Sequence, residues 1–163
     1  KLNLLFEICY LKFVIFIILI YFICYMTSNN TWYNYSDLDP HIWYIKFGKI
    51  ANENQFQSFL VQYESRYINF NKKSIIFNAL DIEHMTFSQC YQLATMMQRM
   101  RPVHRQKLSC FTIVVSNPYI ISLLNFVFSI VPPVRPYIVC KNVDMAKKFI
   151  YVKNPDVYHL NIV

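Results

Sequence analysis

The sequence predicts an α/β fold in which a four- or five-stranded, mostly parallel sheet is covered by about four helices. Strand-like and helical segments alternate after residue 40, and this alternation favours right-handed crossovers between parallel strands. Residues 74–80 (SIIFNAL) and 109–115 (SCFTIVV) are almost continuously apolar, which is typical of strands buried on both faces. The chain after residue 26 is long enough to bury one core, so we expect a single domain over residues 27–163.

The body of the chain begins with two strand-like segments. Residues 32–35 are expected to form a short edge strand, and residues 37–40 a turn. Residues 41–47 predict a second strand that ends at Gly48.

The next segment predicts a helix followed by a strand. Asn52 and Gln55 have the spacing of a capping box, which indicates a helix start. Residues 71–73 end the helix, and residues 74–80 form the strand that follows. Apolar residues at helical spacing define the expected inward face of the helix: Phe56, Phe59, Leu60, Tyr63 and Tyr67.

A second capping box, Thr86 with Gln89, opens the second helix. Proline lacks a backbone N–H and disfavours the helical conformation of the residue before it, so Pro102 predicts that this helix ends near Arg101. Residues 101–105 are then expected to form an exposed connection. The expected inward face of the helix carries Phe87, Cys90, Ala94 and Met97.

Strand and helix alternate twice more after residue 108. A strand at 109–115 is followed by a helix over 118–130, with Asn117 as its N-cap and proline in its first turn. This helix is apolar almost all round, so we expect it to be well buried. A short strand at 136–140 leads to a last helix, which Asn142 caps and whose inward face carries Met145, Phe149 and Ile150.

The composition argues against several classes of enzyme. Gly48 is the only glycine, so glycine-rich nucleotide-binding loops and the nucleophile elbow of hydrolases are absent. The body holds three widely spaced cysteines, Cys90, Cys110 and Cys140, without the spacing of a metal site. We therefore expect buried thiols in a reducing compartment, no metal, no cofactor and no catalytic activity.

Residues 1–26 form an apolar segment with more than one interpretation. Residues 13–26 are unbroken apolar sequence, so residues 8–26 could be a short membrane anchor with Lys12 at the interface. Alternatively, residues 1–25 lie upstream of the true start, because the first methionine is Met26. A signal peptide is a third interpretation, although no small-residue cleavage site follows. The body is expected to be cytoplasmic, and membrane-anchored if residues 8–26 are retained.

Three local features give the chain a resemblance to the STAS-like fold. Residues 45–50 form a strand ending in glycine before a helix, residues 74–80 precede a loop and a helix at Thr86, and residues 142–146 form a polar cap with an acidic turn. In this respect the chain resembles bacterial anti-sigma-factor antagonists and the cytoplasmic tails of sulfate-type transporters. The resemblance implies a STAS-like sandwich with a regulatory, protein-binding role. Residues 84–88 lack the Asp-Ser and glycine of the phosphorylatable members.

Two polar groups flank the predicted start of the second helix. Asp81, Glu83 and His84 follow a strand, where open parallel sheets place their ligand sites. They could bind a metal or small molecule, or they could simply interact with the helix dipole. Thr86 and Ser88 are candidate phosphoacceptors, and as helix caps they would serve only to bind backbone amides.

The densest basic stretch follows at residues 99–107. It could hold an acidic partner, a phosphate or an anionic lipid surface, and such stretches are also common as plain solvated surface. Specific nucleic-acid binding is not expected despite the net charge of +7, because the interleaved aromatic and basic pattern of RNA-binding motifs is absent. The stretch comprises Arg99, Arg101, His104, Arg105 and Lys107.

Our first functional hypothesis is a non-catalytic, regulatory protein-interaction module. It would bind a protein partner through residues 81–89, including Gln89, and the basic stretch, with phosphorylation near Thr86 changing the affinity. The alternative is a metal- or small-molecule-binding protein that uses Asp81, Glu83 and His84. A third hypothesis, a membrane-tethered domain, depends on residues 8–26.

Overall fold

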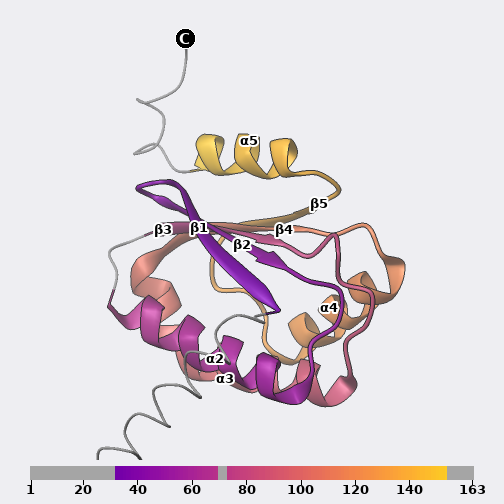
Figure 1. The fold of residues 1–163 in the computed structure, drawn as a ribbon. Helices are drawn as coiled ribbons and strands as arrows, with labels where there is room; N and C mark the ends of the chain where they lie inside the picture. The colour runs from indigo at the N-terminus through magenta and orange to yellow at the C-terminus, as the bar shows by residue number, and fades with distance from the viewer. Residues whose placement is uncertain (1–31, 70–72, 154–163) are drawn as a thin grey trace, which may run out of the picture. The chain divides into compact units, whose positions relative to one another are not determined.

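The computed structural model describes residues 32–69 and 73–153, which form one α/β domain (Figure 1). Its sheet has five strands in the order β1-β2-β3-β4-β5; β1 is antiparallel to β2 and the other neighbours are parallel. The predicted α/β class, with a mostly parallel sheet and four helices, is confirmed. The segment 1–26 lies outside the described residues. The strands are β1 (Tyr33–Asp39), β2 (Ile42–Phe47), β3 (Lys73–Asn78), β4 (Leu108–Val114) and β5 (Tyr137–Cys140).

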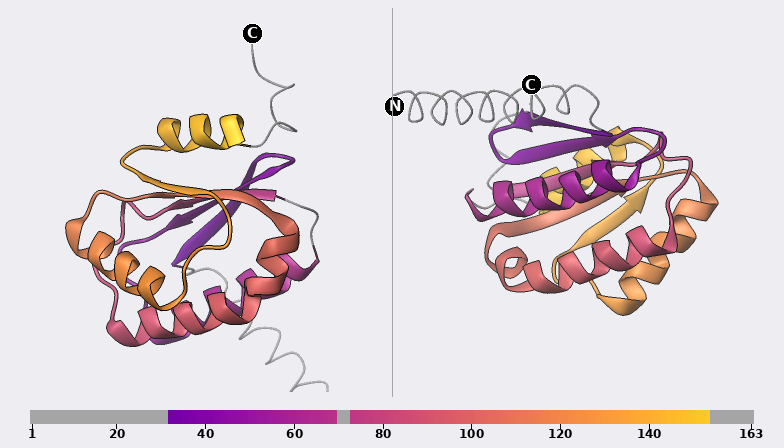
Figure 2. Two further views of the ribbon diagram at one scale, coloured as in Figure 1. Left: turned by 180° about the vertical axis from the view of Figure 1, so that it is seen from behind. Right: turned by 60° about the horizontal axis from the view of Figure 1, so that its bottom comes forward.

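The helices cover the two faces of the sheet unequally. Three of them, α2 (Glu53–Ile68), α3 (Phe87–Lys107) and α4 (Pro118–Ile130), lie on one face, and α5 (Val143–Lys153) lies on the other (Figures 1 and 2). Because successive parallel strands are neighbours in the sheet, right-handed crossovers place the three connecting helices on the same side. No helix within residues 32–69 and 73–153 combines the length and apolarity needed to span a bilayer.

Two hydrophobic cores result, one on each face of the sheet. The core beneath α2, α3 and α4 is built largely from rings, such as Trp32, Phe47 and Phe59, whose centroids lie 4.9–6.1 Å apart. We call it the aromatic core. The core beneath α5, which we call the aliphatic core, has the buried members Ile42, Ile76, Cys110, Val114, Cys140, Ala146 and Ile150.

The predicted helix starts are confirmed in atomic detail. In α2 the Asn52 side chain accepts a hydrogen bond from the Gln55 amide at 2.9 Å, and the Gln55 side chain accepts one from the Asn52 amide at 3.1 Å. Thr86 and Gln89 make the same pair of bonds in α3, at 3.1 and 2.9 Å. These bonds satisfy amides that a helix leaves without an internal partner. The predicted inward face of α2 is buried as well.

The predicted end of α3 is wrong. The helix continues through Pro102 to Lys107, so residues 101–105 form its last turns rather than an exposed connection. Proline removes one helical hydrogen bond and its ring clashes with the preceding turn, and α3 bends toward the sheet in this part (Figure 2). Burial of Met100 and His104 against the aromatic core offsets that cost. Tertiary packing therefore overrides the local helix-breaking residue.

The edge strand β1 is longer than predicted. It continues through Asp39, within the 37–40 segment where we expected a turn, and its register shifts between Asp37 and Asp39. The chain turns at Pro40 and His41 instead, where the His41 amide donates to Asp39 Oδ1 at 2.9 Å. Pairing with β2 thus extends the strand up to the proline.

Three helix orientations also differ from expectation. The α4 helix is only half buried, because nothing in the described part of the chain covers its outer side. On α3, Phe87 is exposed and Met97 half-buried, while Gln89 and Met96 face inwards. On α5, Ala146 and Ile150 are buried, whereas Met145 is exposed. Apolar periodicity alone leaves such rotations undetermined when most positions of a helix are uncharged.

Candidate functional site

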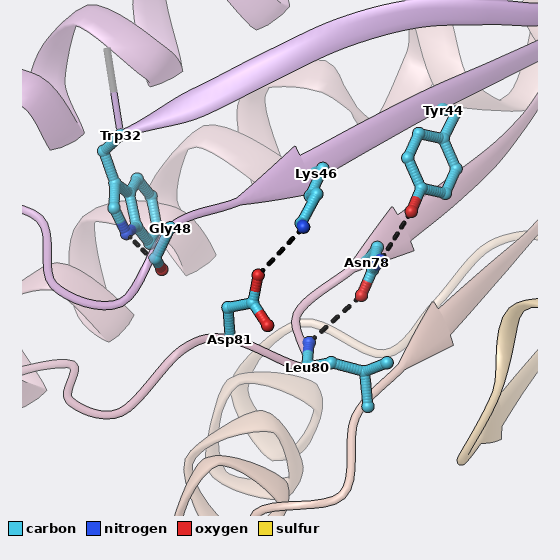
Figure 3. Close-up of polar contacts among 7 residues, drawn as sticks. All are labelled: Trp32, Tyr44, Lys46, Gly48, Asn78, Leu80 and Asp81. Atoms are coloured by element: carbon cyan, nitrogen blue, oxygen red, sulfur yellow. Dashed lines mark hydrogen bonds and ion pairs between the residues drawn. The ribbon is translucent and has the colours of Figure 1, made fainter. Parts of the chain in front are cut away.

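Polar side chains gather where β2 and β3 end (Figure 3). The buried Asn78 amide donates to the Tyr44 hydroxyl at 2.5 Å and accepts from the Leu80 amide at 3.1 Å. The nitrogen and the oxygen of the Asn78 side chain therefore both make hydrogen bonds, one to β2 and one to the loop that follows β3.

The only glycine of the chain lies at the same edge of the sheet. The Trp32 indole N–H donates to the Gly48 carbonyl at 2.8 Å, as Figure 3 shows, and a side chain at position 48 would lie 3.2 Å from the Trp32 carbonyl oxygen. Gly48 thus permits a close approach of two backbone segments, which is a structural role.

The two acids of the predicted strand-end cluster each pair with a different lysine. Asp81 lies 3.1 Å from Lys46 Nζ (Figure 3), and Glu83 lies 2.8 Å from Lys49 Nζ. The hydrogen bonds to these carboxylates raise the pKa of both lysines. Both pairs are exposed and screened by solvent, so they contribute little to stability.

His84 is not brought together with these acids. Its ring lies parallel to that of Tyr119, with centroids 6.1 Å apart. Within the described ranges, no group of three or more His, Cys, Asp or Glu side chains could hold a metal ion. The geometry therefore gives the metal-binding alternative no support.

The candidate phosphoacceptors lie at the first turn of α3, and both are exposed. The Thr86 hydroxyl is engaged in the capping box. The Ser88 hydroxyl accepts a hydrogen bond of 3.4 Å from the Gln92 side chain. Gln89, a predicted partner-binding residue, is buried, and its amide donates to the Ala51 carbonyl at 3.2 Å.

Exposed aromatic side chains surround this turn, and sequence reasoning missed them. Phe87 and Tyr91 on α3 are 65% and 64% exposed. Phe126 on α4 is 39% exposed, and its ring contacts that of Phe87 edge to face, with centroids 5.6 Å apart. We call the exposed residues Phe87, Tyr91, Tyr119, Phe126 and Ile130 the α3–α4 face. The signal in the sequence was the absence of charge from residues 87–98 and 118–130, where a surface helix usually carries charges.

The basic stretch lies at the opposite end of α3. Ser88 and Arg101 are separated by roughly 20 Å of helix at 1.5 Å per residue. Arg99 pairs with Glu64, with its Nε 3.0 Å from the carboxylate. Arg101 donates to the Pro132 carbonyl at 3.1 Å, and Lys107 donates to the Ile68 carbonyl. The structure therefore does not bring the two predicted binding regions together.

Two further members of that stretch have structural contacts. The Arg105 carbonyl accepts a hydrogen bond from the Arg135 guanidinium. His104 is buried, its Nε2 lies 3.1 Å from the Tyr63 hydroxyl, and its ring packs against Tyr67. Burial lowers the pKa of His104 to about 4, so the ring is neutral at physiological pH. His104 therefore belongs to the interior rather than to a binding surface.

Cys90, Cys110 and Cys140 are buried free thiols, as predicted. Burial raises the pKa of each of them. A buried thiol with a raised pKa holds little of the reactive thiolate, so these cysteines act as core residues.

Comparison with known proteins found no matching family model, no matching curated protein and no matching solved structure.

Proposed function

We propose that this domain is a non-catalytic protein-interaction module and that its partner docks on the α3–α4 face. The observation that carries the proposal is the exposure of Phe87 and Tyr91, about two-thirds of each residue, on a domain that buries or half-buries most of its other described rings. Exposed apolar clusters on soluble domains mark interaction surfaces, and aromatic residues are enriched among the residues that dominate binding energy.

The charge distribution indicates what kind of partner fits. Neither α4 nor the first twelve residues of α3 contains a charged side chain, although the chain carries a net charge of +7. Docking here desolvates no ion, and the centres of protein interfaces are depleted of charge in the same way. We infer a protein partner whose matching surface is apolar at its centre. The resemblance to STAS-like regulatory domains supports the same class of function.

A phosphorylation switch fits the same surface. Thr86 and Ser88 flank Phe87 in the sequence, and the Thr86 hydroxyl already caps the helix, which favours Ser88 as the acceptor. A phosphate near a helix N-terminus is compatible with the helix dipole, so α3 would stay folded. Its charge would nevertheless have to be desolvated beside Phe87 on docking. Phosphorylation of Ser88 should therefore weaken partner binding.

Site-specific photocrosslinking in the cells that make the protein tests the docking surface. A benzophenone side chain replaces Phe87 or Phe126 in turn, and Val61 on the exposed side of α2 serves as the matched control position. We expect the same partner to be crosslinked from positions 87 and 126 but not from position 61, and Tyr91→Ala to remove both adducts. Equal crosslinking from position 61, no adduct at all, or adducts only with a second copy of this chain would overturn the proposal.

The switch is tested with the crosslinked partner in a direct binding titration. Ser88→Asp should weaken binding about tenfold or more, whereas Ser88→Asn, similar in size but uncharged, should leave it within about twofold. Equal effects of the two substitutions would exclude a charge-based switch while leaving the docking surface in place.

A further inference from the structure

The aromatic core contains a cavity of about 150 Å³ between the sheet and helices α2, α3 and α4. Side chains from all of these elements form its wall, and nearly all of them are apolar. Representative lining residues are Trp32, Tyr63, Phe77, Met97, Leu124 and Val127. An apolar cavity of this size can hold a molecule the size of benzene.

A buried polar group in the wall already has a hydrogen-bond partner. His104 lines the cavity, and its imidazole shares a hydrogen bond with the Tyr63 hydroxyl at 3.1 Å. Because burial keeps this imidazole neutral, the interior of the cavity has no charge to offer a ligand. The body of a ligand in this space would therefore have to be uncharged and apolar.

A positively charged residue, Arg101, lies where the lining of the cavity reaches the protein surface. The lining residues Arg101, Pro132 and Pro133 are exposed or partly exposed, so the cavity wall reaches solvent between α3 and the connection that precedes β5. Arg101 uses one guanidinium N–H to bind the Pro132 carbonyl at 3.1 Å. Within residues 32–69 and 73–153 no ion pair joins Arg101 to an acidic side chain.

We propose that this cavity binds a small carboxylic acid, with its aliphatic or aromatic body inside and its carboxylate on Arg101. A guanidinium has five N–H donors, so Arg101 can receive a carboxylate while keeping its bond to Pro132. A mostly apolar pocket with one oriented polar group is the usual composition of a small-molecule site. The cavity volume limits the body to about six to eight non-hydrogen atoms. This inference goes beyond the interaction proposed above and uses none of the residues of the α3–α4 face.

The two tryptophans allow a direct test, because Trp32 lines the cavity and Trp43 does not. Titration of the full chain with 4-bromobenzoate should quench tryptophan fluorescence in a saturable way through contact of bromine with Trp32. Trp32→Phe should abolish the saturable quenching and Trp43→Phe should preserve it. Quenching that does not saturate, or that survives in Trp32→Phe, would overturn the proposal.

The proposed contact between the ligand carboxylate and Arg101 is tested by a matched pair of ligands. The neutral amide 4-bromobenzamide should bind the native protein at least about tenfold more weakly than 4-bromobenzoate, and Arg101→Gln should remove that difference. Lys148→Gln, on α5, is the control for loss of a positive charge elsewhere. Equal affinity for the acid and the amide would overturn the assignment of Arg101.

Filling the cavity gives an independent check. Val127→Phe should abolish quenching by 4-bromobenzoate, and Leu124→Phe, at a partly exposed lining position, is the second variant in case the first does not fold. Retained quenching in a folded filling variant, shown by native near-UV circular dichroism, would place the ligand outside the cavity.

Discussion

The two faces of the sheet are stabilised in different ways. The aromatic core joins three helices to the sheet with bulky rings, and it is also the core that contains the cavity of about 150 Å³. The aliphatic core joins one helix to β3, β4 and β5 with isoleucine, valine, alanine and cysteine side chains. The larger core therefore contains a cavity despite its many rings.

The difference follows from the shapes of the side chains. Branched aliphatic residues interdigitate on a pleated surface, whereas planar rings adopt edge-to-face contacts, such as that of Trp32 with Phe59, and both of these rings line the cavity. The aromatic core buries more surface in total but includes space for a ligand.

The largest effect is expected from Phe56→Ala in the aromatic core. Phe56 is 1% exposed and its ring packs against Trp32 and Phe59, so its removal enlarges the void that is already present. We expect a loss of about 4 kcal/mol in the free energy of unfolding, measured by urea denaturation. A loss below about 2 kcal/mol would show that the aromatic core does not dominate stability.

Ile150→Ala makes the corresponding change in the aliphatic core. Ile150, on the inward side of α5, is fully buried, and we expect a loss of about 3 kcal/mol. The two sites lie on opposite faces of the sheet, so the double variant should show the sum of the single effects within about 0.5 kcal/mol. Strong non-additivity in the same denaturation experiment would mean that the two cores do not act independently.

Acidification should destabilise the aromatic core through His104. Its pKa is about 4 in the folded state and near 6.5 when unfolded, so the unfolded chain takes up the proton first as the pH falls. Stability is therefore full above pH 6.5 and decreases by about 2.5 kcal/mol as the pH falls from 6.5 to 4. Comparison with His104→Gln over this range isolates the effect, since carboxylates titrate in both proteins. Identical pH profiles would contradict the prediction.

The smallest effects come from two tyrosines one turn apart on α2. The Tyr63 hydroxyl is bonded to His104, whereas the buried Tyr67 hydroxyl has no hydrogen-bond partner in the described structure. Tyr63→Phe should cost about 1 kcal/mol, and Tyr67→Phe should stabilise by up to about 1 kcal/mol because it removes an unsatisfied polar group. Thermal unfolding of the two variants measures both changes in stability. A destabilising Tyr67→Phe would indicate that the hydroxyl has a partner such as a buried water.

Much of the fold could be predicted from short-range patterns. The capping boxes at Asn52 and Thr86 mark helix starts because their hydrogen bonds form between residues three apart. Strands β3 and β4 are recognisable by their apolar runs, because burial on both faces favours apolar side chains at successive positions. The candidate site was less predictable, since Phe87 looked like a core residue by its spacing and is exposed.

The sequence by itself determined the order of strands and helices, where the helices begin, and a mostly parallel sheet. Only the tertiary structure decided that α3 continues through Pro102, that α4 is half exposed and that Asp81 and Glu83 pair with separate lysines. The physical reason is the separation along the chain of the residues that interact. Caps and periodicity act between neighbours along the chain, whereas the rotation of a helix and the partner of a charge depend on residues far away in sequence.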